Sequence, residues 1–240
     1  MDLQELVRTE LSEYLNCKGW IPYSGLSALA KGDYYLMGLN PAIDDSIIPL
    51  GHAKFNDGKW SAYKNQCWRK HNGGQCDHIE QMPDEKGVVK APSRHQKEIL
   101  ALAEVLGIEI EMIFSANAVF IATATGTELK NISTIWNACW PIHQEFLSVV
   151  LPRWVICLGN GENQSSYSLL KQKNIDATQE RKSGGPKFHR WKWFDGTFPL
   201  GMCRQHRCTV VGLPHPSHRF FGRLEANWRD FHESVVKRDQ

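Results

Sequence analysis

The sequence lacks any run that is long and apolar enough to cross a membrane, and nothing at its start resembles a signal peptide. Residues 1–5 are acidic and amphipathic, so we expect a cytoplasmic protein whose seven cysteines are reduced. The phosphate-binding patterns GxGxxG and GxxxxGK[ST] are absent, which argues against a nucleotide cofactor. Internal repeats, low-complexity segments and linkers are missing too. The 240 residues therefore predict one domain, 1–240.

The chain also lacks a large excess of charge of one sign. Its formal net charge is only +2, which is too small to indicate nucleic-acid binding by itself. Residues 181–192 are an exception, since this segment has basic residues and no acid, with Trp191 and Trp193 within or beside it. Cations neutralise phosphates and aromatic faces stack on bases, a combination that suits single-stranded or distorted nucleic acid. A solvated β-hairpin with a cationic face explains the segment equally well.

Short apolar runs alternate with amphipathic segments along the chain. Strands are predicted at 34–38, 112–120, 154–159 and 208–213, and helices at 3–15, 93–107, around 136–147 and at 224–236. This alternation predicts an α/β fold, a three-layer α/β/α sandwich with a short, mainly parallel four-stranded sheet. Residues 43–92 show little periodicity and are interpreted as a long insertion. Ligands of such sheets bind beyond the carboxyl ends of the strands.

Two polar motifs follow predicted strands. The first is GLNPA at 38–42, and the second is HPSHR at 215–219. The pair resembles the GxNPG and HPSP motifs of the uracil-DNA glycosylase superfamily, nearest its mismatch-specific and single-strand-selective branches. Ala42 and His218 depart from that pattern, which leaves the choice of substrate open.

The resemblance continues between the two motifs. Asn117 falls where the superfamily places a base-reading Asn at the end of its second strand. The run CWP at 139–141, a following helix, Pro152 and the strand VICLG at 155–159 resemble a passage of the thermophilic branches. The matches follow the family order from about residue 33 to 220.

The resemblance implies a role for each pocket residue. Asn40 would position the water that attacks the sugar, and His215 would donate a hydrogen bond to the base oxygen as negative charge develops. Asn117 would read the base edge, because an amide donates and accepts at once. Phe55 is the first choice for the stacking ring and Trp60 the second. A carboxylate could come from Asp44 or Asp45.

The second motif and its flank are expected to contact DNA. Ser217 would grip a phosphate, and Arg219, Phe220 and Phe221 are candidates for the wedge that fills the space left by the flipped base. No lysine occupies a motif position for a Schiff base, so we expect base excision without strand cleavage. The expected partner is DNA, with no membrane, and the expected state is a monomer.

No metal or other cofactor is expected. Zinc is the alternative, because Cys67, His71, Cys76 and His78 are suitable ligands; the competing set is Cys203, His206 and Cys208. Neither spacing is a standard finger, and reduced thiols and surface histidines also explain it. The chain has no C-x-x-C, which argues against an iron–sulfur cluster.

Three other functions stay open from the sequence. The nearest is a glycosylase of the same fold that removes hypermodified bases, such as glucosylated hydroxymethylcytosine, from phage DNA as antiviral defence. The second is a catalytically silent DNA-binding module that senses a flipped base. The third is a hydrolase acting on a nucleoside or another small molecule.

Overall fold

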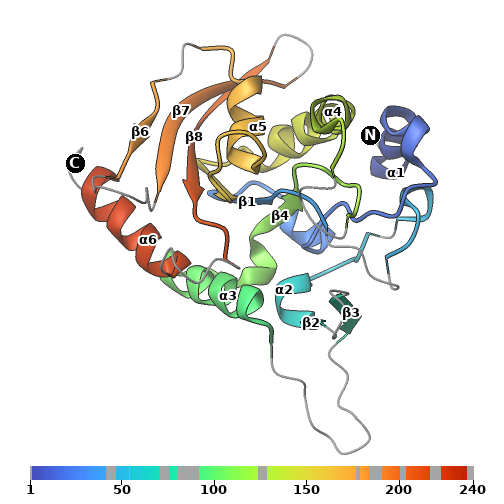
Figure 1. The fold of residues 1–240 in the computed structure, drawn as a ribbon, viewed down its shortest axis with the longest axis horizontal. Coiled ribbons are helices and arrows are strands. Elements are labelled where there is room, and N and C mark those ends of the chain that lie inside the picture. The colour runs from blue at the N-terminus through green and yellow to red at the C-terminus, as the bar shows by residue number, and fades with distance from the viewer. Residues whose placement is uncertain are drawn as a thin grey trace, which may run out of the picture.

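A computed structural model of the protein describes residues 2–41, 47–53, 55–70, 76–80, 92–123, 129–176, 179–183, 191–200, 204–216 and 223–236. Its α-helices are α1 (Leu3–Glu10), α2 (Ala62–Asn65), α3 (Arg94–Leu106), α4 (Ile132–Val150), α5 (Ser166–Lys173) and α6 (Leu224–Phe231). Its strands are β1 (Tyr34–Gly38), β2 (Gln66–Lys70), β3 (Cys76–Glu80), β4 (Phe114–Asn117), β5 (Trp154–Leu158), β6 (Arg181–Lys182), β7 (Lys192–Pro199) and β8 (Gln205–Leu213). The fold is therefore α/β, as the sequence predicts (Figure 1).

The main sheet has six strands in the order β4-β1-β5-β8-β7-β6, and β2 and β3 form a separate hairpin. Neighbours from β4 to β8 are parallel, whereas β7 runs antiparallel to β8, and β6 antiparallel to β7. The expected four-stranded sheet was thus too small. The two additional strands, β6 and β7, come from the basic segment and the residues after it. β8 also begins three residues earlier than predicted, and its residues from Gln205 to Gly212 pair with β7.

Alternate residues of the strands enter two separate cores, one on each face of the sheet. Tyr35, Met37 and Val155 pack with α1, α4 and α5 on one face, which we call the α4 face. On the other face, which we call the α3 face, Leu36, Ile156 and Leu158 pack with α3 and α6. This alternation is the two-residue period of a strand that is buried on both sides.

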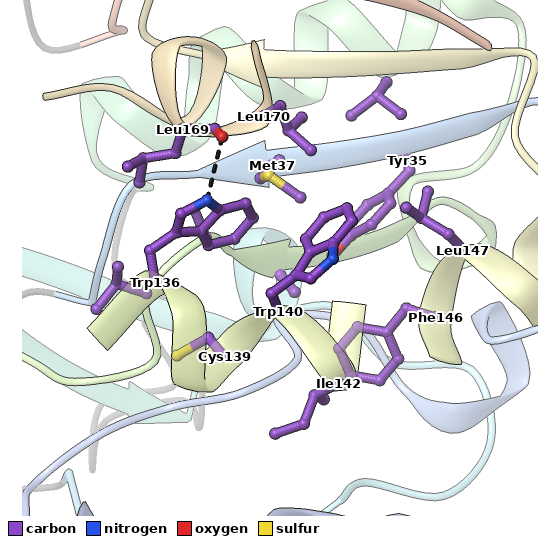
Figure 2. Close-up of a cluster of buried hydrophobic side chains, with 14 of the residues drawn as sticks. Tyr35, Met37, Trp136, Cys139, Trp140, Ile142, Phe146, Leu147, Leu169 and Leu170 are labelled. Atoms are coloured by element: carbon purple, nitrogen blue, oxygen red, sulfur yellow. Dashed lines mark hydrogen bonds between the residues drawn. The ribbon is translucent and has the colours of Figure 1, made fainter. Parts of the chain in front are cut away.

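Helix α4 fills the first core with large side chains (Figure 2). Trp136 is fully buried, and its indole Nε1 donates to the carbonyl of Leu169 at 3.1 Å. Pro141 lies inside this helix of 19 residues, so the CWP run is part of α4. The sequence interpretation, which placed the run before the helix, is wrong on this point. The neighbouring apolar side chains hold the helix together around its proline.

Helix α3 begins and ends where the sequence predicts. Ser93 accepts from the backbone of Gln96, the Gln96 side chain bonds back to Ser93, and Gly107 closes the helix with a φ of 70°. These are a capping box and a left-handed C-terminal glycine.

Part of the predicted insertion belongs to the core. Leu50, Ala62 and Tyr63 are buried, and α2 packs on α3. In the described ranges, no helix combines the length and apolarity that a membrane span requires.

Candidate active site

Three of the predicted polar residues lie at one edge of the sheet. Gly38 pairs with Asn117, and Leu158 pairs with Leu213, so β4, β1, β5 and β8 end level with one another. Asn117 is the last residue of β4, whereas Asn40 and His215 each follow their strand by two residues. Adjacent strands lie about 4.8 Å apart. This edge is where open α/β sheets bind their ligands.

Asn117 is buried on the α3 face. Only 6% of the residue is exposed, and its Nδ2 has no hydrogen-bond partner among the described residues. The amide leans over Gly38, because a Cβ added at Gly38 would collide with Asn117 Oδ1. A glycine at this position therefore makes room for the amide.

The backbone beside Asn117 is held by a buried histidine. The His143 ring accepts from the Tyr35 hydroxyl at Nδ1 (2.8 Å) and donates from Nε2 to the Ala118 carbonyl (3.0 Å), since a carbonyl can only accept. Burial lowers the pKa of His143 to about 4, although bonds to the Ala118 and Asn117 backbone oppose this. The ring is therefore neutral at pH 7 and fixes the chain that carries Asn117.

Asn40 is half-buried and is held by its amide nitrogen. Nδ2 donates to the Thr123 hydroxyl at 2.8 Å and to the Pro41 carbonyl at 2.9 Å. An amide held in this way presents its oxygen as the acceptor, which is the atom that orienting a water requires. No sequence pattern links Thr123 to Asn40, because the two residues lie 83 positions apart along the chain.

His215 lies against rings that the sequence analysis did not single out. Its centroid is 5.4 Å from that of His95, with the planes at 67°. His95 in turn stacks on Tyr63, with centroids 6.2 Å apart and planes at 11°. A Cβ added at Gly159 would lie 3.9 Å from the His215 ring, and the φ of 139° at this position favours glycine. The predicted cap at Ser93 could have placed His95 in the first turn of α3, but not beside His215.

Neither predicted stacking ring joins this group in the structure. Phe55 packs on the α4 face, where it lines a small depression with Val7 and Leu50 of the N-terminal region. Trp60 stacks on Trp20, with planes at 5° and centroids 6.3 Å apart. Among the described residues, the ring that contacts His215 is His95, which in turn stacks on Tyr63.

No protein-family model matches the chain, and no curated protein does.

The described ends of the basic segment lie on the antiparallel strands β6 and β7, and its tryptophans face inward. Trp191 and Trp193 are each 6% exposed and both contact Phe231. Trp191 also donates to Asp230 at 2.8 Å, and the Arg181 guanidinium covers Trp193 at 4.8 Å. The interpretation of these rings as a stacking surface for bases is therefore wrong, because the indoles belong to the core on the α3 face.

Several of the other predicted residues lie outside the described part of the chain. Ser217, Arg219, Phe220, Phe221, Asp44, Asp45 and His71 lie outside the described residues, as do Cys203 and the side chains of Cys67, Cys76 and His78. His206 bonds to the Pro152 carbonyl at 2.7 Å, and Cys208 is buried. Within the described part of the chain, no three His, Cys, Asp or Glu residues come together as metal ligands.

Taken together, the edge of the sheet presents an amide donor on Asn117, an amide acceptor on Asn40 and an imidazole on His215. None of the three is a strong base at neutral pH. Such groups can hold a planar polar ligand, orient a water and stabilise negative charge on a leaving group.

Proposed function

We propose that the protein is a monofunctional DNA glycosylase that flips a uracil-like or modified pyrimidine out of DNA and hydrolyses its N-glycosidic bond. The observation that carries the proposal is the buried Asn117 amide, whose Nδ2 has no partner among the described residues. An unsatisfied buried donor costs about 1–3 kcal/mol, which a ligand oxygen would recover. A pyrimidine extruded from the helix offers such a carbonyl oxygen.

Asn40 positions the attacking water in this proposal. Its amide orientation is fixed through Thr123 and Pro41, so Oδ1 accepts a hydrogen from the water near the sugar C1′. Because an amide takes no proton at neutral pH, the gain comes from orientation, which holds the water close to the reacting carbon.

His215 stabilises the departing base. The water oxygen forms a bond to C1′ while the bond from C1′ to the base nitrogen breaks, and the electron pair leaves with the base. The anion spreads onto its carbonyl oxygens, where a hydrogen bond from the imidazole is strongest as charge develops. The water proton leaves to solvent or to the released base.

The proposal is tested with oligonucleotides that contain uracil, thymine mismatches, hydroxymethyluracil or glucosylated hydroxymethylcytosine, followed by alkali to reveal abasic sites. Alkali-dependent cleavage on any of them supports a glycosylase and identifies its base class. Excision confined to the glucosylated base assigns the antiviral alternative. Uncut DNA across the panel, with binding retained, contradicts the proposal and favours the silent module.

Variants then test the site. We expect Asn40→Ala and His215→Ala each to lower the single-turnover rate by about 10²-fold or more, with unchanged thermal unfolding. His206→Ala is the matched control, because this histidine lies on β8 at the opposite end of the strand and bonds only a backbone carbonyl in the described contacts. Full activity in both variants would contradict the roles proposed for Asn40 and His215.

A further inference from the structure

Two lysines continue the polar edge of the sheet beyond β8. Lys192 is the first residue of β7 and pairs with Gly212, three residues before His215. Lys182 of β6 pairs in turn with Lys192. Paired residues of neighbouring strands lie on the same face, and a Cβ added at Gly212 would collide with Tyr167 of α5. Both lysines therefore lie on the α4 face beside α5, about 5 and 10 Å from β8.

Glu162, in the loop between β5 and α5, supplies an anion to this lysine pair. Its Oε1 lies 3.5 Å from Lys192 Nζ and 3.9 Å from Lys182 Nζ. The Glu162 side chain is 76% exposed, whereas that of Lys192 is only 7% exposed. Among the described residues, Lys192 has no ion pair other than this one. A nearly buried ammonium is thus neutralised by a carboxylate that remains largely in water.

A second carboxylate in the same group is held more firmly. Glu180 has a side chain that is 17% exposed, and its two oxygens contact separate lysines, Lys171 at 3.1 Å and Lys182 at 3.2 Å. These are hydrogen-bond distances, whereas both distances to Glu162 are longer than that range. Glu162 is therefore the weakly held anion. If it left, the three lysines would face one carboxylate.

We propose that Lys182 and Lys192 bind a phosphodiester of DNA, and that Glu162 is an internal anion which this phosphate displaces. Lysine binds phosphate as a point charge, and an exposed ion pair costs little to break. Phosphates recur about every 3.4 Å along a strand, so a strand with one base beyond β8 can place a neighbouring phosphate on β7. The inference rests on the proposed function in taking DNA as the ligand.

The test measures binding of a labelled, unmodified single-stranded oligonucleotide by fluorescence anisotropy over a range of salt concentrations. No base has to be released, so the readout is independent of excision. The variants of the full chain are Glu162→Gln, Lys182→Gln, Lys192→Gln, and the double lysine variant with and without Glu162→Gln. Lys173→Gln is the matched control, because this lysine is the last residue of α5 and bonds Asn137, whereas Glu162 precedes the start of that helix.

We expect Glu162→Gln to tighten binding about fivefold, the effect of one unit charge at contact distance in water. Each single lysine variant should weaken binding by a similar factor and reduce the slope of log K against log salt by about 1. In the double lysine variant, Glu162→Gln should gain less than about twofold, since only its screened long-range repulsion is removed. Lys173→Gln should leave affinity and slope unchanged. Lys182→Gln keeps the test decisive if Lys192→Gln does not fold.

A purely structural ion pair predicts the opposite sign for Glu162. In that case Glu162→Gln would lower the melting temperature without tightening binding, whereas displacement by phosphate leaves the melting temperature unchanged. Equal gains from Glu162→Gln with and without the lysines overturn the inference, as does an absence of DNA binding in every variant. Binding of inorganic phosphate alone to Glu162→Gln, with no gain for the oligonucleotide, assigns a small-anion site and also overturns it.

The two proposals fail in different ways. If the variants bind DNA as expected but the wild type releases no base from any oligonucleotide, excision fails and the phosphate contact stands. If the wild type releases base but Glu162→Gln binds no more tightly, the phosphate contact fails and excision stands.

Discussion

Gly38 and Asn117 face each other across β1 and β4, and the space over the glycine is filled by the amide. We predict that Gly38→Ala displaces the Asn117 side chain, because the new Cβ would collide with Oδ1. Overpacking of this kind costs about 1–3 kcal/mol of unfolding free energy. In the proposed glycosylase it should also lower base release. Urea unfolding and the oligonucleotide assay measure the two effects.

The control for this change is Gly32→Ala. A Cβ at Gly32 would meet only the Ala30 carbonyl at 3.7 Å, an ordinary contact, so stability should stay within about 1 kcal/mol of wild type. Adding Asn117→Ala to Gly38→Ala removes the collision and should restore part of the lost stability. If Gly38→Ala and Gly32→Ala unfold at the same urea concentration, the packing argument is wrong.

At the scale of elements, one buried side chain joins α3 to α2. Gln96→Ala leaves the carbonyls of Ala62 and Tyr63 without its amide and opens a cavity, so we expect a loss of about 3 kcal/mol. Ser93→Ala removes only the helix cap and should cost about 1 kcal/mol. Equal losses in chemical denaturation would show that Gln96 acts as part of the cap alone. Hydrogen exchange in α2 should quicken in the first variant only.

The stability of the whole molecule should depend on pH through His143. Burial lowers the pKa of this ring to about 4, whereas an unfolded histidine titrates near 6.5. The unfolded chain therefore binds the extra proton first. The contribution of neutral His143 is fully present above about pH 6.5 and is lost progressively as the pH falls toward 4, by about 3 kcal/mol in all.

Thermal unfolding from pH 7.5 to 4.5 measures this slope. His143→Gln should be less stable at pH 7, because one amide replaces both ring nitrogens, but its decline between pH 6.5 and 4.5 should be shallower. Parallel declines in the two proteins would assign the acid sensitivity to other groups. Burial opposes ionisation of Glu111 and Glu180, but bonds to lysines outweigh it and lower the pKa of both groups. Their contribution to stability is therefore fully present above the ordinary pKa of a carboxyl group and is lost only as the pH falls through that range and below it.

Across the molecule, the predictions that were confirmed depend on local patterns. The limits of α3 were readable from Ser93 and Gly107, and the apolar runs indicated β1, β5 and the end of β8. The extent of the sheet was not readable. The core role of Trp191 and Trp193 depends on contacts with Phe231, which lies about 40 residues further along the chain.

The sequence by itself determined that this is an α/β chain, that Asn40 and His215 follow strands and that Asn117 lies on one, because capping and strand periodicity depend on neighbouring residues. The tertiary structure alone decided which groups meet there. It placed Thr123 on Asn40, His95 on His215 and Phe55 on the opposite face, because such contacts are set by strand order and helix packing.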